Sequence, residues 1–353
     1  MGWLLFDALQ AFPGFSARWG RLAAQLVGAH PLFDTRFIAP LLAHFGGDGT
    51  RLAVLGDPDS PRAMLLLEHY RTGMWRSFLP SQAQVAPVLI AGSDVPRIFD
   101  LVSELPGLVL SLDLLAQDPR YVSFVEAARD EDLVEVQSHA RTVSVSTTGS
   151  FDQYWESRSR ALAKNIRRYG HRLERDGLEF RLEVATRTAD VLARLNDYGR
   201  LESAGWKGEA GTAISPGNVQ GSFYSAVMRA FADDGSARIY SLLDGDRLVS
   251  SRLVLSSPEM FVILKTTHDE TYRQYAPGRQ LLHEALRDLF ESGAGRMIEF
   301  YTNAASEQLA WATDDREICN LRFFRSRAAR WAIGSGHATR SAVRRLSGRE
   351  APD

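Results

Sequence analysis

Two β-prone runs, Ala237-Arg-Ile-Tyr-Ser-Leu-Leu243 and Leu248-Val-Ser-Ser-Arg-Leu-Val-Leu255, flank the turn Asp244-Gly-Asp-Arg247. Glycine tolerates the positive φ that tight turns need, so this pattern predicts a β-hairpin. Ser256-Ser-Pro258 then reverses the chain into a third β-prone run, Met260-Phe-Val-Ile-Leu-Lys-Thr-Thr267. The stretch therefore predicts three sequential antiparallel strands.

A turn of small residues and an amphipathic helix follow the third strand. The turn begins Arg273-Gln-Tyr-Ala-Pro-Gly-Arg-Gln-Leu-Leu282, and its proline suits the first position of a helix. Apolar residues then recur at helical spacing up to Ser292-Gly293, and a short strand is expected over residues 297–301. Backbone N–H groups at such a helix start attract anions. The turn is therefore either a pyrophosphate cradle without a lysine or an ordinary strand-to-helix turn.

The composition indicates a globular chain without a bias toward polyanions. It has 353 residues, 45% of them hydrophobic, with 41 Lys and Arg against 43 Asp and Glu. Such a length allows about two domains and a sizeable core. The overall charge gives no sign of DNA binding. The single cysteine, Cys319, excludes an intramolecular disulfide.

Several function classes lack their sequence signals. The start of the chain has no basic n-region with a cleavage site, and no apolar run approaches the ~20 residues that span a bilayer, so we expect a cytoplasmic protein. The histidines are not spaced as zinc ligands, so no metal is expected. The absence of a Gly-x-Ser-x-Gly elbow and of a Walker loop argues against hydrolases of that class and P-loop ATPases.

The first half of the chain repeats the order of a helical segment followed by a meander. Residues 3–44 are expected to be mainly helical, and four short strands follow between residues 51 and 91. A helix over 95–105, a strand over 108–112 and a short helix from Pro119 complete this half. We therefore predict an α/β (α+β) fold with two similar domains, each a mixed, largely antiparallel sheet flanked by helices. Their predicted limits are 1–138 and 139–330, followed by a basic, partly disordered tail over 331–353.

The second half opens with a strand over residues 141–147 and a long helix beginning near Phe151. Apolar and basic residues separate onto opposite faces of that helix. The apolar side is expected to hold Trp155, Leu162, Ile166, Tyr169 and Leu173, and the basic side Arg160, Lys164, Arg167, Arg168, His171 and Arg175. The basic side is either a solvated face or a contact for coenzyme A phosphates, an anionic acceptor or RNA. A strand over 178–184 and helices over 189–202 and 221–232 follow.

Four segments carry a resemblance to a known family. They are Trp155-x-x-Arg158, Lys164-Asn-Ile-Arg-Arg168, Glu202-Ser-Ala-Gly-Trp-Lys-Gly208 and Ala276-Pro-Gly-x-x-Leu-Leu282. Together they resemble the Fem-related branch of the GNAT acyltransferase superfamily, and within it the chain is most similar to the group of cellulose-biosynthesis-type acetyltransferases. The spacing Arg273-x-x-Ala276-x-Gly278 resembles the superfamily's pyrophosphate signature, with Ala276 in place of the first Gly. The resemblance implies tandem GNAT-like domains, of which the C-terminal one holds the acyl donor.

The resemblance also implies a site for acetyl-CoA as acyl donor. Pantetheine is expected along the third meander strand, where a backbone N–H would steady the oxyanion. The donor-binding residues expected on this basis are Ile263, Leu264, Lys265, Arg273, Ala276, Gly278, Arg279, Gln280 and Leu281.

The acceptor is expected to enter where the third meander strand diverges from residues 297–301. Glu299 and Tyr301 are the candidates for base and acid, and the alternatives are a plain solvent-facing strand residue and a half-buried edge aromatic. Glu202, Trp206 and Lys207 are candidate acceptor contacts, and the alternative is a loop anchored by one buried Trp.

Beyond Leu321 the chain carries eight arginines against two acidic residues. This tail is either a weak contact for a membrane surface or RNA, or a solvated end of the chain.

Three functions are therefore carried forward. The first is a coenzyme A-dependent N- or O-acyltransferase acting on a small molecule, sugar or polysaccharide precursor. The second is a Fem-like aminoacyl transferase that takes its donor from charged tRNA. The third is a non-catalytic binding protein that keeps the fold.

Overall fold

The computed structural model describes residues 2–116, 122–204, 214–215, 217–293, 295–301 and 303–333. The N-terminal half of the chain contains β1 (Trp3–Asp7), α1 (Ala8–Val27), η1 (Pro31–Phe33), α2 (Thr35–Phe45), β2 (Arg51–Asp57), β3 (Ser60–Arg71), β4 (Met74–Ser77), β5 (Val88–Leu89), η2 (Gly92–Asp94), α3 (Arg97–Glu104), β6 (Ser111–Ala116), α4 (Val122–Arg129) and β7 (Val134–Ser146). The C-terminal half contains α5 (Phe151–Glu156), α6 (Arg160–Arg175), β8 (Phe180–Ala185), α7 (Thr188–Ser203), α9 (Val219–Ala232), β9 (Ala237–Asp244), β10 (Arg247–Ser256), β11 (Met260–His268), η4 (Glu270–Tyr275), α10 (Pro277–Ser292), β12 (Met297–Glu299), α11 (Ser306–Trp311) and β13 (Asp314–Phe324).

Within the described residues the strands form one 13-stranded sheet in the order β1-β2-β3-β4-β6-β13-β7-β12-β11-β10-β9-β8, with β5 paired to β3 outside this path. Almost all neighbours are antiparallel, but β4 pairs with β6 and β11 with β12 in parallel. The three-strand meander predicted from the sequence is confirmed as β9, β10 and β11.

The two halves share one topology. Each runs strand, two helices, three antiparallel strands, helix, a strand parallel to the third of those strands, helix and strand. The prediction of two similar mixed α/β units is therefore confirmed at the level of element order, and α5 and α6 are an addition before the second unit.

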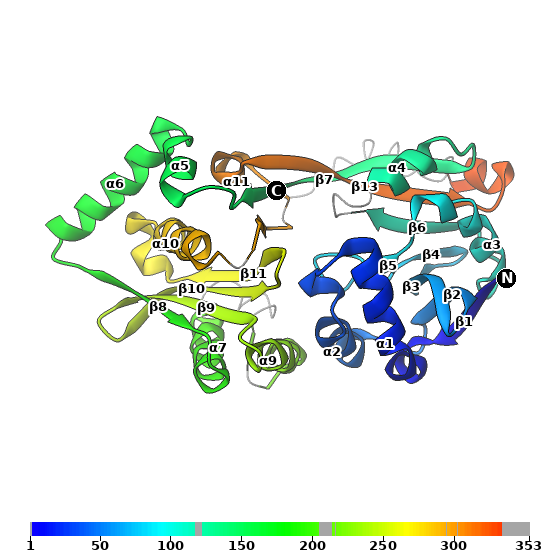
Figure 1. Cartoon of the computed structure of the whole chain (residues 1–353), viewed down its shortest axis with the longest axis horizontal. Helices are drawn as coiled ribbons and strands as arrows, with labels where there is room; N and C mark the ends of the chain where they lie inside the picture. Colours follow the sequence, from blue (N-terminus) through cyan, green and yellow to red (C-terminus); the bar gives the residue numbers. More distant parts are fainter. Residues whose placement is uncertain are drawn as a thin grey trace, which may run out of the picture.

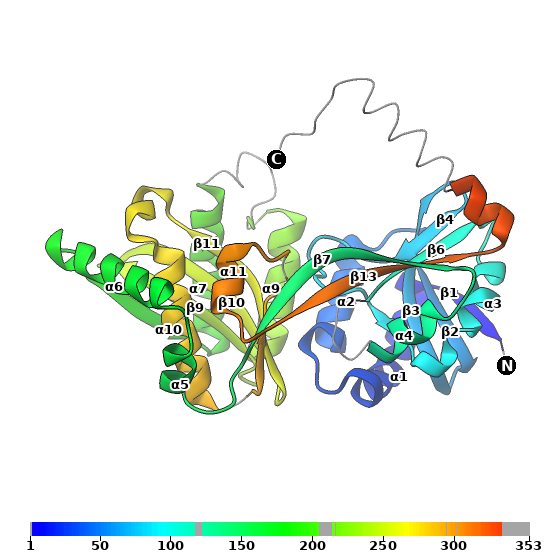
Figure 2. The same ribbon diagram turned by 90° about the horizontal axis from the view of Figure 1, so that it is seen from above.

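The last strand of each half is exchanged with the other half. β13, which ends the second unit, inserts between β6 and β7 of the first, and β7 inserts between β12 and β13. Figures 1 and 2 show these two long strands running side by side from one half to the other. The division predicted between residues 138 and 139 falls inside β7, a strand that both halves use.

Two local predictions from the sequence are wrong. Residues Trp3–Asp7 form a strand paired with β2 rather than the start of a helix, because Asp7 caps α1 by accepting from the backbone N–H of Gln10. A run of apolar residues alone does not distinguish the two structures. The long helix expected from Phe151 is broken into α5 and α6, since Ser159 caps the second helix by accepting from the N–H of Leu162.

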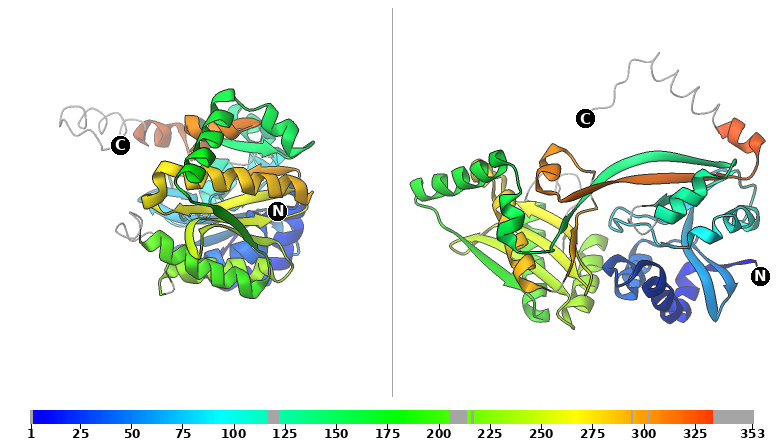
Figure 3. Two further views of the ribbon diagram at one scale, coloured as in Figure 1. Left: turned by 90° about the vertical axis from the view of Figure 1, so that its left-hand side faces the viewer. Right: turned by 45° about the horizontal axis from the view of Figure 1, so that its top comes forward.

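Helices cover both faces of the sheet in the C-terminal half. α7 and α9 pack on one face, and α10 with α5 packs on the other (Figure 3). The apolar side predicted for α10 is buried, with Leu281, Leu286 and Leu289 at most 1% exposed. The two halves also meet through α2 and α9, where Phe37 and Phe45 pack edge-on against Phe223. These contacts bring residues of the first half beside β11.

The predicted apolar and basic faces of the helix are confirmed in α6. Leu162 and Leu173 are buried, whereas the basic residues singled out on the opposite side are all exposed. Residues 334–353 of the basic tail lie outside the described residues. Within the described part, no helix is long and apolar enough to cross a membrane.

Candidate active site

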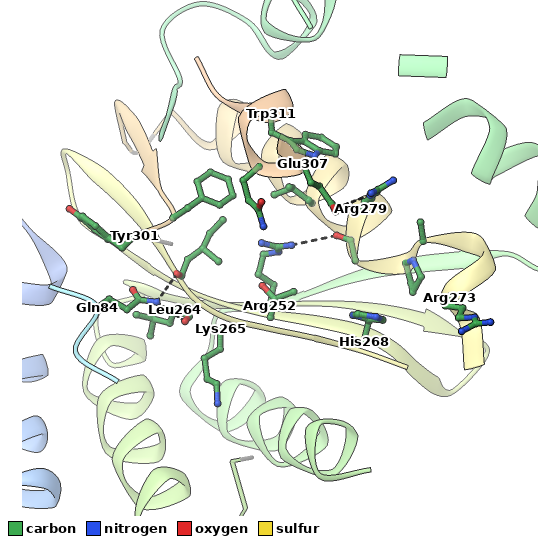
Figure 4. Close-up of a pocket in the computed structure, with 18 of the residues that line it drawn as sticks. Gln84, Arg252, Leu264, Lys265, His268, Arg273, Arg279, Tyr301, Glu307 and Trp311 are labelled. Carbon is green, nitrogen blue, oxygen red and sulfur yellow. Dashed lines mark hydrogen bonds and ion pairs between the residues drawn. The ribbon is translucent and has the colours of Figure 1, made fainter. Parts of the chain in front are cut away.

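A large pocket opens where β11 and β12 part. Their parallel pairing covers only Met260 to Val262 opposite Met297 to Glu299, and the two strands diverge beyond those residues. The resulting pocket has a volume of about 860 Å³ and extends from this opening to the start of α10 (Figure 4). Pockets of this size suit a cofactor-sized ligand.

The start of α10 is a turn with an unusual backbone conformation. Ala276 lies in the left-handed region with φ of 48°, which glycine adopts far more readily, and Pro277 occupies the first helical turn. No side chain caps this helix end. A Cβ atom added to Gly278 would lie 3.8 Å from His268 Nδ1, an ordinary contact. The turn therefore presents an uncapped helix N-terminus to the pocket, a favourable place for an anion.

Most of the predicted donor-binding residues line this pocket. They are Ile263, Leu264, Lys265, Arg273, Ala276, Gly278 and Arg279. Gln280 does not line it, because its side-chain amide donates to the carbonyl of Tyr275 at 2.7 Å. Leu281 does not line it either, since it is fully buried in the core under α10.

Gln84 of the N-terminal half reaches into this pocket and was missed from the sequence. Its Nε2 donates to the carbonyls of Ile263 at 3.2 Å and Leu264 at 2.7 Å, and its own backbone has φ of 57°. These carbonyls belong to the segment of β11 on which pantetheine was expected. Because a carbonyl oxygen has two lone pairs, a ligand here must share these acceptors with Gln84 or displace it.

Tyr301 lines the pocket and is held by a second residue of the N-terminal half. His30 Nε2 lies 2.7 Å from the Tyr301 hydroxyl, and His30 Nδ1 accepts from the N–H of Leu32. A neutral imidazole whose Nδ1 is an acceptor carries its proton on Nε2, so His30 donates to Tyr301. The Tyr301 hydroxyl hydrogen must then point away from His30. Tyr301 follows the end of β12 by two residues, and its φ of 42° lies in the left-handed region.

Glu299 is fully buried and does not line the pocket. Its Oε2 accepts from Arg316 Nη2 at 2.8 Å, and the Arg316 guanidinium lies over the Tyr301 ring at 5.5 Å. Glu299 is therefore connected to the pocket through Arg316 and Tyr301. Its predicted role as base stays a prediction.

Glu202 lies beneath the sheet on α7 and does not line the pocket. It is fully buried and accepts from Lys265 Nζ at 3.0 Å, from the N–H of Ile214 at 2.8 Å and from the Tyr198 hydroxyl at 3.2 Å. Figure 4 shows the Lys265 side chain pointing toward the helices on this face. Burial, reinforced by Glu202, raises the pKa of the Tyr198 hydroxyl well above its usual range. Trp206 and Lys207, the other predicted acceptor contacts, lie outside the described residues.

α6 and α11 border the pocket beside α10. Arg279 Nε donates to Glu307 Oε1 at 2.7 Å, and its Nη1 donates to the Tyr169 hydroxyl at 3.2 Å. The hydrogen bond from Arg279 holds the pKa of the Glu307 carboxyl below its usual range. Ion pairing thus ties α11 to the first turn of α10.

Arg252 is a further pocket residue that the sequence did not single out. It lies on β10, projects from the sheet into the pocket and is 6% exposed (Figure 4). Burial lowers the pKa of its guanidinium to about 10. Among the described residues, no group of three His, Cys, Asp or Glu side chains is placed to hold a metal ion.

Comparison with known proteins agrees with the fold. Residues 160–309 match the family model of the Acetyltransferase (GNAT) domain. No curated protein matches the sequence closely enough to count as a relative.

Three solved structures share the fold over most of their length. The C-terminal domain (DUF2156) of a putative lysylphosphatidylglycerol synthetase from Agrobacterium fabrum superposes with a TM-score of 0.57 at 11% identity, covering 91% of this chain and 96% of that one. FemX gives a TM-score of 0.57 at 9% identity, covering 88% and 96%. L-PGS from Bacillus licheniformis gives 0.54 at 12% identity, covering 95% and 97%. At such identities the likeness concerns the fold alone.

Proposed function

We propose that this chain is an N- or O-acyltransferase that uses acetyl-CoA as its acyl donor. The observation that carries the proposal is a pocket that runs from the uncapped start of α10 to the opening between β11 and β12. The matched acetyltransferase domain covers most of the residues that line this pocket, whereas Ser81, Gln84 and Trp311 lie outside it.

The donor's pyrophosphate would bind at the first turn of α10. Its negative charge would meet the positive end of the helix and the Arg273 side chain, and Gly278 leaves room for close approach. The thioester arm would then extend along Ile263 and Leu264 toward Tyr301. Gln84 would position the carbonyl groups of that segment from the N-terminal half.

The chemistry needs a proton donor for the leaving thiolate and an acceptor for the nucleophile's proton. An amine or hydroxyl would attack the thioester carbonyl, so that a new C–N or C–O bond forms and the C–S bond breaks. Tyr301 would protonate the sulfur, and the hydrogen bond from His30 supports this role because it leaves the Tyr301 hydroxyl hydrogen pointing away from His30. Glu299 would take up the nucleophile's proton only through an intermediary, since it is buried behind Arg316.

The acceptor class in this proposal is a small molecule, sugar or polysaccharide-related compound. It rests on the sequence resemblance to the Fem-related branch and its cellulose-biosynthesis-type group. The acceptor would enter beside Gln84 and Tyr301, which line the pocket at the divergence of the strands.

The first test is calorimetric titration of acetyl-CoA into the wild type, Gly278→Glu and Gly14→Glu. The glutamate at 278 places a negative charge at the expected pyrophosphate site, and we expect binding to weaken by at least about tenfold, equivalent to about 1.4 kcal/mol. Gly14 is an exposed position of α1 with no atoms near its added Cβ, so it is a matched control that should bind like the wild type. A folded wild type that shows no binding at millimolar acetyl-CoA sinks the proposal.

A second candidate is a transferase that takes its acyl group from aminoacyl-tRNA. The observation that favours it is the exposed basic side of α6, a helix that projects from the body of the protein (Figure 1). Tyr169 of the same helix lines the pocket, so an RNA bound along α6 could present its end there.

Filter binding of charged tRNA at 50 and 200 mM salt tests this alternative. RNA contact through α6 predicts strong salt dependence and a loss of affinity in Lys164→Glu and Arg168→Glu. Arg21→Glu, on the exposed side of α1, is the matched charge reversal and should have no effect. Equal weak binding by all variants argues against the tRNA donor.

The third function, a non-catalytic binding protein, predicts a different pattern. Tyr301→Phe and Glu299→Gln would leave its biological activity unchanged. If the wild type transfers acetyl groups and Tyr301→Phe binds acetyl-CoA equally well but has lost this activity, the protein is not a non-catalytic binding protein.

A further inference from the structure

Arg252 occupies an unusual position for an arginine. It lies in the middle of the sheet, on β10, between Tyr240 of β9 and Thr266 of β11. Its side chain projects into the pocket between α10 and α11 and is almost completely shielded from solvent (Figure 4). Arginine is rarely buried to this degree unless its charge is compensated.

Three other arginines and lysines that are largely shielded from solvent around the sheet have carboxylate partners. Lys265 pairs with Glu202 at 3.0 Å, Arg316 with Glu299 at 2.8 Å, and Arg322 donates two hydrogen bonds to Asp113 at 2.8 and 2.7 Å. Each of these pairs supplies the counter-charge that a buried cation needs.

Arg252 has no such partner among the described residues. Its contact is a long one, from Nη2 to the carbonyl of Gly278 at 3.4 Å, and its buried Nε makes no hydrogen bond. A guanidinium has five N–H donors, so most of the hydrogen-bonding capacity of Arg252 faces the pocket.

The charge of Arg252 persists at neutral pH. Although burial lowers the pKa of its guanidinium, the value of about 10 still leaves it protonated at pH 7. The uncapped N-terminus of α10 contributes positive potential to the same pocket. A buried guanidinium beside a helix N-terminus is a site prepared for an oxyanion rather than for a neutral group.

We infer that Arg252 binds an oxyanion, phosphate or carboxylate, carried by the molecule that fills this pocket. The inference deepens the proposed function, on which it rests for the pocket being the ligand site. Two sources of the oxyanion fit: a phosphate of the acyl donor, and an acidic group of the acceptor. In either case the ligand supplies a counter-charge that none of the described residues provides to Arg252.

This arrangement has a consequence for the ligand-free protein. An unpaired buried charge is unfavourable until its partner arrives, so replacing Arg252 by the apolar Met should leave the empty protein as stable as the wild type or more stable. A structural arginine behaves in the opposite way. Arg322→Met is the matched control, because it leaves Asp113 buried without its partner and should lower the melting temperature.

The experiment measures thermal unfolding of the full chain as wild type, Arg252→Met, Arg252→Lys and Arg322→Met. Each is measured alone and with acetyl-CoA, inorganic pyrophosphate or citrate. We expect Arg252→Met to keep or raise the melting temperature of the empty protein and to bind the stabilising anion about 10- to 100-fold more weakly, which is the usual effect of a lost charged hydrogen bond. Arg252→Lys should retain part of the affinity, and Arg322→Met should retain all of it.

The source of the oxyanion follows from which probe loses affinity. Loss of acetyl-CoA and pyrophosphate binding in Arg252→Met assigns the residue to the donor phosphates, whereas loss of citrate binding alone assigns it to an acidic acceptor. A third result is that the wild type binds pyrophosphate or citrate more tightly than Arg252→Met does, while neither protein binds acetyl-CoA. That result supports the inference about Arg252 and contradicts acetyl-CoA as the donor.

Three results overturn the inference. The first is an Arg252→Met protein that unfolds at a clearly lower temperature than the wild type, or does not fold, because the arginine is then structural. The second is unchanged affinity for every anion that the wild type binds. The third is a wild type that none of the three anions stabilises.

Discussion

Glu202→Gln is expected to be one of the more costly single substitutions in this protein. The Glu202 side chain is 0% exposed and accepts hydrogen bonds from Lys265, Ile214 and Tyr198. The amide removes the negative charge, so the Lys265 ammonium, whose side chain is 15% exposed, loses its counter-charge. Breaking a buried ion pair from one side costs about 3 to 5 kcal/mol, and the partial exposure of Lys265 places this case near about 3 kcal/mol.

Urea unfolding followed by both tryptophan fluorescence and circular dichroism measures this cost. Coincident transitions are needed before a free energy of unfolding is extracted from a chain of this size. Lys265→Met and the double variant complete a mutant cycle, in which we expect a coupling of about 2 kcal/mol. Glu174→Gln is a matched control on the exposed side of α6, expected to lie within about 0.5 kcal/mol of the wild type. A Glu202→Gln cost no larger than that of Glu174→Gln refutes the reasoning.

Three further predictions concern the pocket. Tyr301→Phe should lower the turnover number about 10²-fold or more with acetyl-CoA affinity unchanged, and His30→Ala should produce a smaller loss of the same kind. If Tyr301→Phe and the wild type turn over equally fast in steady-state assays, Tyr301 is not the proton donor. Gln84→Ala should change KM for the donor more than the turnover number, and an effect confined to turnover speaks against positioning of the donor arm. Arg279 lowers the pKa of Glu307, so their ion pair stabilises the fold above the unfolded carboxyl pKa of about 4.3, and this stabilisation is lost as pH falls through the pKa of Glu307 in the folded protein. The difference in unfolding free energy between the wild type and Glu307→Gln should therefore be present at pH 7 and disappear toward acid pH. A difference that stays constant with pH excludes the ion pair as its cause.

Local sequence patterns predicted the part of the pocket that one continuous segment builds. Residues 237–292 contain the three-strand meander, the left-handed turn at Ala276 and the helix whose apolar side is buried. Each of these features depends on residues only a few positions apart. Turns are indicated by the residue types at their corners, and strands and helices by apolar residues that recur every two or every 3.6 positions. Seven of the nine expected donor-binding residues line the pocket for this reason.

The remaining pocket residues come from contacts that no local pattern contains. Gln84 meets β11 across 179 and 180 positions of sequence, and His30 meets Tyr301 across 271. Neither residue carries a motif that marks it, since both act through hydrogen bonds that depend on the packing of the two halves. Arg252 is unremarkable in the sequence because burial, which gives it its significance, is a property of the folded sheet.

The exchange of β7 and β13 is likewise a feature that local sequence patterns do not predict. The sequence by itself predicted a strand over residues 141–147, which overlaps β7, and two similar α/β units that follow one another, but it did not predict β13. Only the tertiary structure decided that each unit completes its sheet with the other's last strand. Strand propensity reports whether a segment fits an extended, half-buried surface, whereas the choice of neighbour depends on free energy gained over the whole sheet. That choice joins the two halves, which brings His30 and Gln84 to a pocket whose β11 and α10 walls the sequence predicted.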